Sequence, residues 1–273
     1  LGQNFLTDKN IIDEIIEGAG IGPRDLVIEI GPGIGVLTWE AAQRAQKVIA
    51  VEIDQNLIPI LGETLREADN IEIVNQDILK TDLNTLIEAK KAEAEAADMP
   101  LAHVRVIGNL PYYITTPIIM KLLEDGVAAD SITVMMQKEV AERMRALPGT
   151  KAYGALSVAV QYYCEAENVV TVPASCFVPQ PKVTSAVVRM DRRAAPPASV
   201  DDEKLFFRTV RAAFAQRRKT LSNALRSAFS ELDRAAIESA MEETGLPPAV
   251  RGETLSIAQF AALSNALLRK FDK

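Results

Sequence analysis

Apolar runs made mostly of β-branched residues recur along the first two thirds of the chain. Five of them predict buried strands, at residues 26–30, 48–53, 71–74, 104–108 and 132–136. Apolar residues at helical spacing fill the gaps between these runs. A strand that is apolar at nearly every position is buried on both faces, so the pattern predicts a parallel sheet that helices cover on both sides.

The pattern changes after Tyr163. Extended pieces at residues 169–172 and 183–190 flank the proline-rich segment 178–181, and we expect them to form an antiparallel hairpin at the sheet edge, where proline is tolerated. Residues 192–199 resemble a linker, and the remainder is helical in pattern. The chain therefore predicts an α/β domain over residues 1–191 and a small all-α domain over residues 192–273.

The composition is that of an ordinary globular protein, since 48% of the 273 residues are hydrophobic. No apolar run approaches the roughly 18 residues of a membrane span and no signal-peptide pattern opens the chain, so we expect a cytoplasmic protein without membrane contact. The chain begins at Leu1, and we expect the first residues of the natural protein to precede it. Cys164, Cys176 and His103 lack metal-site spacing, so no metal is expected. No heptad pattern indicates a partner, and we expect a monomer.

The net charge of −7 is unevenly distributed. Residues 182–226 contain eleven basic and four acidic side chains, an excess of seven positive charges, which leaves −14 for the rest of the chain. Clustered Lys and Arg residues are what phosphate binding requires. The charge distribution therefore favours a nucleic-acid partner, although a basic surface alone is also typical of a merely solvated one.

A glycine-rich segment, Glu29-Ile30-Gly31-Pro32-Gly33-Ile34-Gly35, follows the first predicted buried strand. Glycines at such a turn allow the backbone to approach a ligand closely. The third glycine of the dinucleotide fingerprint is replaced by Val36, which disfavours an NAD-dependent oxidoreductase.

Two carboxylates end the next two strands. Glu52 lies where it can accept hydrogen bonds from both ribose hydroxyls of an adenosine group, and Asp77 where it can accept from an adenine amino group. Ligands in open α/β sheets bind at the carboxyl ends of strands, and all three features lie there. The alternative is that Glu52 is a loop charge and Asp77 a helix cap.

The fourth buried strand runs into Asn109-Leu110-Pro111-Tyr112. The lone pair of an adenine amine is delocalised into the ring, so a methylase must hold the nitrogen toward its electrophile. The side-chain oxygen of Asn109 and the carbonyl of Leu110 can each accept one N–H of that amine. Pro111 fixes the turn, and Tyr112 offers a surface on which an extruded base can stack.

Several segments together resemble the ribosomal RNA adenine dimethyltransferases, and most of all the bacterial group that modifies the 3′ hairpin of small-subunit (16S) rRNA. Besides the motifs above, these segments are Leu1-Gly2-Gln3-Asn4-Phe5-Leu6, residues 177–183, and Arg217-Arg218-Lys219-Thr220-Leu221 with Asn223. The resemblance implies a Rossmann-like class I methyltransferase sheet covered by helices on both faces, S-adenosylmethionine as methyl donor, and 16S rRNA in a small subunit or its precursor as partner. It also implies dimethylation of N6 on two adjacent adenosines. Tyr113, in place of a small polar residue, and a longer acidic insertion before Val104 depart from the family.

The resemblance also implies roles for individual residues. Cofactor contacts are expected at Asn4, Leu6, Gly31, Gly33, Glu52, Ile53, Asp77, Ile78 and Asn109. Phe177 is expected to lie across the target base from Tyr112. The expected catalytic residues are therefore Asn109, Leu110, Pro111, Tyr112 and Phe177. RNA contacts are expected at Lys182, Arg211, Arg217, Arg218 and Lys219. If the C-terminal segment is one helix, Lys204, Arg208, Arg211, Arg218 and Arg226 share a face opposite Phe207, Val210, Phe214 and Leu221.

Two other functions remain open at this stage. A large-subunit rRNA methylase of the antibiotic-resistance type shares the same loop and cofactor site. A non-catalytic RNA-binding assembly factor could retain the fold. The presence of Glu52, Asp77 and Asn109 argues against the loss of catalytic activity.

Overall fold

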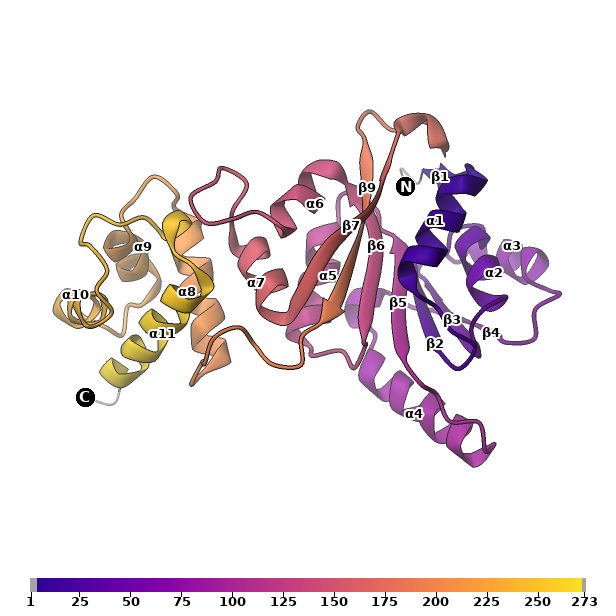
Figure 1. Ribbon diagram of the computed structural model, residues 1–273, viewed down its shortest axis with the longest axis horizontal. Coiled ribbons are helices and arrows are strands. Elements are labelled where there is room, and N and C mark those ends of the chain that lie inside the picture. The colour runs from indigo at the N-terminus through magenta and orange to yellow at the C-terminus, as the bar shows by residue number, and fades with distance from the viewer. Residues whose placement is uncertain (1–3, 272–273) are drawn as a thin grey trace. The chain divides into compact units, whose positions relative to one another are not determined.

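The structure is a computed structural model that describes residues 4–271. Its central sheet has seven strands in the order β4-β3-β2-β5-β6-β9-β7 (Figure 1). The strands are β2 (Leu26–Ile30), β3 (Lys47–Glu52), β4 (Ile71–Asn75), β5 (Val104–Asn109), β6 (Ser131–Gln137), β7 (Cys164–Val172) and β9 (Ser185–Arg192). The five predicted buried strands pair in parallel, and β9 pairs antiparallel with β6. The strand predictions are therefore confirmed, although β7 begins earlier than its apolar run.

Helices cover both faces of this sheet. In this part of the chain they are α1 (Lys9–Ala19), α2 (Val36–Ala42), α3 (Leu57–Thr64), α4 (Leu83–Ala96), α5 (Thr115–Glu124) and α6 (Lys138–Met144). In Figure 1, α1 and α2 lie in front of the strands and α5 lies behind them. Helix α1 begins where the Asp8 carboxylate accepts from the Asn10 and Ile11 amides, and it ends at Gly20, whose φ is 64°. Its buried isoleucines join the core.

A short second ladder connects the N-terminal segment to the hairpin beyond β7. Strand β1 (Phe5–Leu6) pairs antiparallel with β8 (Phe177–Val178), so that Leu6 lies opposite Phe177. The Thr7 amide extends the ladder by donating to the Cys176 carbonyl at 2.9 Å. The apolar pattern does not predict these strands, because two residues show no periodicity. The ladder places residues 4–6 beside a segment more than 170 residues away in sequence.

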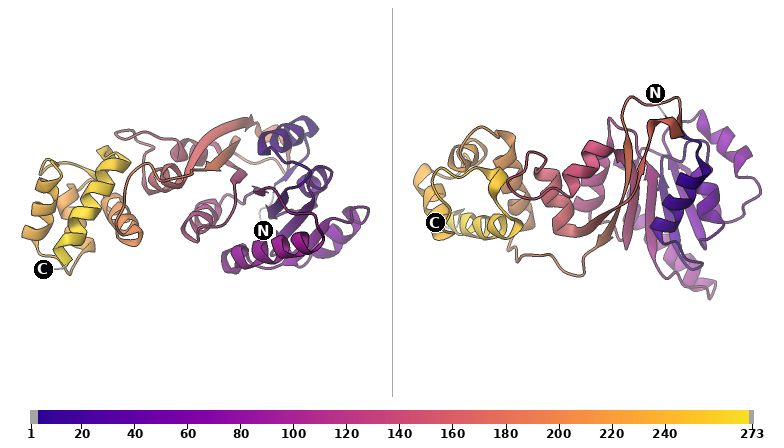
Figure 2. Two further views of the ribbon diagram at one scale, coloured as in Figure 1. Left: turned by 60° about the horizontal axis from the view of Figure 1, so that its bottom comes forward. Right: turned by 45° about the horizontal axis from the view of Figure 1, so that its top comes forward.

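The chain divides into two compact units. Among the described residues, the first contains those up to Ala141 together with Glu165–Arg192, and the second contains Glu142–Cys164 and the residues from Arg193 onward. The second unit is helical, with α7 (Ala155–Tyr163), α8 (Glu203–Ala215), α9 (Leu221–Ala228), α10 (Arg234–Glu243) and α11 (Ile257–Phe271), as Figure 2 shows in two further views. The sequence assigned residues 142–164 to the first domain. In the structure they cluster with the C-terminal helices.

Aromatic contacts explain why α7 clusters with those helices. The ring of Tyr162 lies 4.9 Å from that of Phe206, and the ring of Tyr163 stacks on that of Phe207 at 5.4 Å. Such pairs stabilise packing beyond their buried area. None of the helices within residues 4–271 is both long and apolar enough to cross a membrane.

Candidate functional site

The glycine-rich turn follows β2 directly. Gly31, Gly33 and Gly35 all have positive φ, at 67°, 61° and 90°, a region that L side chains rarely adopt. The Gly31 amide donates to the Val51 carbonyl of β3 at 3.0 Å, and Gly35 is the N-cap of α2. Helix α2 therefore begins at Val36, immediately after the turn, and the backbone of the turn faces a pocket at the carboxyl end of the sheet.

Glu52, the last residue of β3, is 3% exposed and its carboxylate is held at both oxygens. Oε2 accepts from the Gly33 amide at 3.4 Å, and Oε1 accepts from the Asp54 amide at 2.8 Å. These bonds link the glycine-rich turn to the loop after β3. Glu52 is therefore not a free loop charge, and its orientation is set before any ligand arrives.

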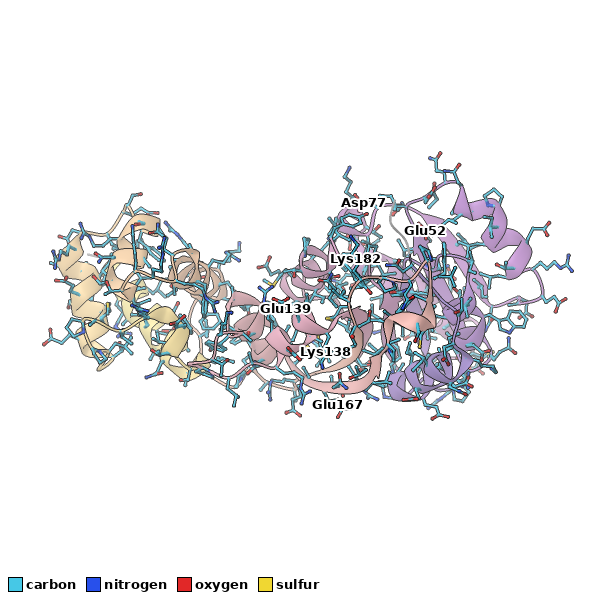
Figure 3. All side chains as sticks on the ribbon, turned by 90° about the horizontal axis from the view of Figure 1, so that it is seen from above. Glu52, Asp77, Lys138, Glu139, Glu167 and Lys182 are labelled. Atoms are coloured by element: carbon cyan, nitrogen blue, oxygen red, sulfur yellow. The ribbon has the colours of Figure 1, made fainter. Side chains whose placement is uncertain are left out.

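Asp77 follows β4 and is the N-cap of a short 3-10 helix, η1 (Ile78–Lys80). Its Oδ1 accepts from the Leu79 amide at 2.9 Å, so the helix-cap interpretation applies to this oxygen. Asp77 also lines a pocket together with Glu52, and the two residues are labelled near one another in Figure 3. Capping and ligand binding are compatible, because a carboxylate has several acceptor positions.

Two adjoining pockets form the candidate site, and both are lined by Gly31 and Pro111. The first also contains Asn4, Leu6, Glu29, Gly33, Asn109, Leu110 and Tyr112. The second also contains Glu52, Ile53, Asp77, Ile78 and Tyr113. The nine residues that the sequence assigned to the cofactor therefore all line one pocket or the other.

The loop after β5 is positioned by close backbone packing. A Cβ at Gly108 would lie 2.6 Å from the Ile30 carbonyl oxygen, so only glycine allows β5 to approach β2 at this register. Asn109 Nδ2 donates to the Asn4 carbonyl at 3.1 Å. This bond fixes the orientation of the Asn109 amide. Its Oδ1 atom is then the group that can accept a hydrogen bond from a ligand.

The turn beyond Asn109 is rigid. The Pro111 carbonyl accepts from the Ile114 amide at 3.1 Å and from Thr115 Oγ1 at 2.9 Å. The Tyr112 hydroxyl lies 2.6 Å from the hydroxyl of Ser185, the fully buried first residue of β9. The Tyr112 ring is therefore held at both ends, by the turn and by β9.

Phe177 differs from the other predicted catalytic residues. Its side chain is only 3% exposed and packs within the hydrophobic core, and neither pocket is lined by it. It pairs through β8 with Leu6, which does line the first pocket. The structure thus places Phe177 in the core, outside the lining of both pockets.

The predicted RNA-binding residues fall into two groups. Lys182, Arg218 and Lys219 are exposed, and so is Arg211, which has interaction partners of its own. Arg217 is exposed as well, but its guanidinium is hydrogen-bonded within the helical unit. Its guanidinium donates to the carbonyls of Lys151, at 3.0 Å, and Tyr153.

The prediction of one basic helical face is wrong. Helix α8 ends at Ala215 and α9 begins at Leu221, so the residues before and after this break do not share a face. Arg208 lies 4.3 Å from the Phe229 ring centroid and bonds to the Ala228 carbonyl and to Glu231. Phe207 and Val210 of the predicted apolar stripe are buried on α8, and Leu221 is also buried but lies on α9.

Glu29, part of the glycine-rich segment, was not assigned a role from the sequence. It is 1% exposed, it lines the first pocket, and its Oε2 atom has no hydrogen-bond partner in the described part of the chain. Burial raises the pKa of Glu29 to about 7, opposed by the Thr38 hydroxyl and reinforced by the Glu52 carboxylate. A carboxylate inside an otherwise apolar strand is the sequence signal that could have identified it.

The strand order, the glycine-rich turn and the acidic end of β3 define a Rossmann-like methyltransferase fold. The model of one family, described as ribosomal RNA adenine dimethylase, matches residues 1–268. The chain belongs to this ribosomal RNA adenine dimethylase family. Ribosomal RNA small subunit methyltransferase A from Geobacillus thermodenitrificans is 52% identical to it over 273 residues, which cover 99% of this chain and 91% of the relative.

Two solved structures resemble the whole chain. A dimethyladenosine transferase from Plasmodium falciparum has a TM-score of 0.76 at 25% identity and covers 97% of this chain and 98% of its own. The 23S rRNA methyltransferase ErmE has a TM-score of 0.67 at 30% identity and covers 97% of this chain and 99% of its own. Family and fold therefore agree with the resemblance seen in the sequence.

Proposed function

We propose that the protein transfers methyl groups from S-adenosylmethionine to N6 of two adjacent adenosines in the 3′-terminal hairpin of 16S rRNA, giving N6,N6-dimethyladenosine. The observation that carries this proposal is the Asn109 loop at the carboxyl end of β5, lining the same pocket as the glycine-rich turn. The small-subunit target is supported by relatives named ribosomal RNA small subunit methyltransferase A. The reaction would belong to small-subunit assembly in the cytoplasm.

The residues of the two pockets fit the proposed cofactor. Its methyl group is attached to a sulfonium and is therefore electrophilic. Glu52 would accept the two ribose hydroxyls, and Asp77 would accept from the adenine amino group, with Ile53 and Ile78 on the apolar sides of the second pocket. The close approach needs the positive-φ backbone at Gly31 and Gly33, and the other end of the cofactor would contact Asn4 and Leu6.

The target adenine would enter the first pocket. Asn109 Oδ1 and the Leu110 carbonyl would each accept one N–H of the amine, which turns the nitrogen lone pair toward the methyl group. Pro111 keeps the turn closed, and the Tyr112 ring would stack on the base. Phe177 is proposed as the opposite wall. Because its side chain is buried, stacking there would require the segment around β8 to shift.

We also propose that residues 192–273 form the RNA-binding domain. Its exposed Arg211, Arg218 and Lys219, with Lys182 of the first unit, would contact phosphates of the small subunit or its precursor. The Arg217 guanidinium would contribute by holding the 151–153 backbone rather than by direct contact. Methylation of large-subunit rRNA is the second candidate, favoured by the similarity to ErmE.

The test is transfer of labelled methyl groups to small ribosomal subunits that lack the modification, with large subunits offered in parallel. We expect dimethyladenosine at two adjacent positions of 16S rRNA, located by mass spectrometry. Asn109→Ala should abolish transfer, and because it also removes one of the expected cofactor contacts, calorimetry measures the loss of cofactor affinity separately. Activity in that variant would refute the assignment of the loop. Labelling of large subunits alone would favour the second candidate, and cofactor binding without turnover would favour a non-catalytic assembly factor.

A further inference from the structure

The ladder formed by β1 and β8 has two faces with different surroundings. Residues that lie directly opposite one another in an antiparallel pair share a face, and successive residues along a strand alternate between faces. Leu6 and Phe177 are such a pair, and both are buried in the hydrophobic core. Phe5 lies opposite Val178, so this second pair occupies the other face. Val178 is 62% exposed and Phe5 is only partly buried, which makes this the open face of the ladder.

The open face borders the first pocket. Phe5 and Tyr112 are the two aromatic residues among the described residues that line this pocket. The pocket also contains Asn109, whose side-chain oxygen would accept from the target amine. Single exposed apolar side chains are common on protein surfaces. Here an exposed valine and a partly exposed phenylalanine share one face beside the proposed base site, which indicates a contact surface.

Hydrogen bonds on both sides of Phe5 fix its place relative to the catalytic loop. Before it, the Asn4 carbonyl accepts from Asn109 Nδ2 at 3.1 Å. After it, the Thr7 amide and hydroxyl both donate to the Cys176 carbonyl, at 2.9 and 3.2 Å. The backbone at Phe5 is thus tied to the loop that would hold the amine and to the segment that precedes β8. A ring on this backbone keeps a constant position relative to the Asn109 acceptor.

The loop that follows β8 adds a positive charge to this part of the chain. Lys182 lies in that loop and is exposed. At the end of the loop, the Thr184 carbonyl accepts from the Lys138 amide at 3.0 Å, which anchors the loop to the first residue of α6. A nucleotide combines a flat base, which can stack on an apolar surface, with an anionic phosphate. An apolar face followed by an exposed ammonium group therefore fits a nucleotide of the RNA.

We propose that Phe5 and Val178 form a contact surface for the extruded adenosine, with the Phe5 ring against the base and Val178 against the ribose at the pocket mouth. The inference rests on the proposed function, in which the adenine enters the first pocket with one face on Tyr112. The other face of the base then meets Phe5, which lines the pocket without any rearrangement. Phe177 would reach the base only after a shift around β8, and in this arrangement it supports the ladder from the core face.

Binding to small ribosomal subunits tests both contacts. Subunits assembled with a 16S rRNA whose 3′ segment is synthetic carry either adenosine or an abasic nucleotide at both target positions. An abasic nucleotide keeps the ribose and phosphate and lacks only the base. S-adenosylhomocysteine is present throughout, because it has no methyl group to transfer.

Five variants separate the two faces of the ladder. Phe5→Leu removes the ring and Phe5→Tyr keeps it, while Val178→Ser removes the aliphatic contact. Val183→Ser is the matched control for Val178, because Val183 is another exposed valine and lies beyond the ladder. Phe177→Leu removes the ring on the core face. Calorimetry with S-adenosylmethionine and the melting temperature show whether each variant is folded.

We expect Phe5→Leu to weaken the binding of adenosine-containing subunits about fivefold, because the base loses a stacking partner, and to leave the binding of abasic subunits unchanged. Phe5→Tyr should bind both kinds of subunit normally. Val178→Ser should weaken both about two- to threefold, because both retain the ribose. Val183→Ser should weaken neither. Phe177→Leu should lower the melting temperature, and any loss of binding should be equal for the two kinds of subunit.

Several outcomes would overturn the inference. One is an equal loss by Phe5→Leu on both kinds of subunit, since the ring would then not contact the target base. Another is normal binding by Phe5→Leu together with an adenosine-dependent loss in Phe177→Leu, which would make Phe177 the wall of the base site. Equal losses in Val183→Ser and Val178→Ser would exclude a contact specific to the ladder. Methyl transfer by the unaltered protein would leave the proposed function standing in each case, and its absence would refute that function as well.

Discussion

The hydroxyl oxygens of Tyr112 and Ser185 lie 2.6 Å apart, joining the loop after β5 to the first residue of β9. Ser185 is fully buried and lies opposite Gln137 of β6, so its position is set by the sheet. The Tyr112 phenol is thereby oriented by a strand that comes more than 70 residues later in the chain. A ring held in this way presents a fixed face to a base.

Loss of this hydrogen bond should slow methyl transfer without weakening cofactor binding. Ser185→Ala and Tyr112→Phe each remove one hydroxyl, and we expect each to lower kcat about fivefold, the equivalent of roughly 1 kcal/mol for one hydrogen bond. The double variant should be no slower than either single variant, because both remove the same interaction. Single-turnover methyl transfer measures the rate, and calorimetry with S-adenosylmethionine measures the binding.

A fluorescent base separates positioning from folding. With 2-aminopurine in place of the target adenosine, extrusion into the pocket raises fluorescence as the base leaves its stack. We expect Ser185→Ala to reduce that rise while the melting temperature changes little. If the double variant were instead slower by the product of the two single effects, the hydroxyls would act separately and the positioning role would be wrong.

Glu29 should make the ligand-free protein less stable as the pH rises. Its pKa is about 7 in the folded protein against 4.5 as the ordinary value, so the folded state favours the protonated form. Stability from this group is therefore complete below pH 4.5 and is lost as the pH rises through 7. The loss amounts to about 3 kcal/mol, at roughly 1.4 kcal/mol per pKa unit.

Chemical denaturation of Glu29→Gln and the unaltered protein between pH 5 and pH 8 measures this difference. We expect the free energy of unfolding of the variant, relative to the unaltered protein, to increase from pH 5 to about pH 7 and to level off above it. A constant difference would mean that Glu29 titrates normally in the folded protein. The measurement is made on the ligand-free protein and needs no cofactor.

Arg217 and Arg218 are neighbours in sequence but should respond differently to substitution. Arg217 donates to two backbone carbonyls of the 151–153 segment, and its Nε lies 3.9 Å from a Glu253 oxygen. Arg217→Ala should therefore lower the free energy of unfolding by about 1 to 3 kcal/mol. Arg218 is exposed. Arg218→Glu should leave stability unchanged and weaken RNA binding.

Binding of the small-subunit RNA across a series of salt concentrations distinguishes the two roles. Loss of a phosphate contact at Arg218 should reduce the slope of log affinity against log salt by about 1. Denaturation curves report on Arg217 in parallel. An Arg218→Glu variant with unchanged affinity and slope would exclude phosphate contact there, and an Arg217→Ala variant of normal stability would exclude the structural role.

The sequence predicts the central sheet well because its signal is local. Apolar runs mark each buried strand, and the glycines of residues 31–35 are required by the backbone of the turn. The glycine-rich turn, Glu52 and Asp77 could be predicted for a related reason. They lie at the ends of consecutive strands, and the carboxyl ends of parallel strands meet at one edge of a sheet. The remaining cofactor contacts, such as Asn4 and Leu6, were implied only by the family resemblance.

The features that the sequence does not predict depend on distant contacts. The β1–β8 ladder and the Tyr112–Ser185 bond join segments whose pairing has no local pattern. Residues 142–164 cluster with the helical unit through rings such as Tyr162 and Phe206, which look like ordinary core residues in sequence. The prediction of one basic face was wrong because residues 216–220 interrupt the helix, and no proline or glycine in the sequence marks this break.

Tyr113 lines the second pocket and is 71% exposed. Ile53, 61% exposed, lines the same pocket. An aromatic ring and an aliphatic side chain at one pocket can contact the faces of a bound adenine, at about 0.5 to 1.5 kcal/mol for an aromatic pair. Tyr113→Ala should therefore raise the KM for S-adenosylmethionine about three- to tenfold and leave kcat unchanged. Tyr113→Phe, which keeps the ring, should retain the normal KM. If kcat fell in Tyr113→Ala while the KM stayed constant, Tyr113 would act on the RNA side of the reaction and not on the cofactor.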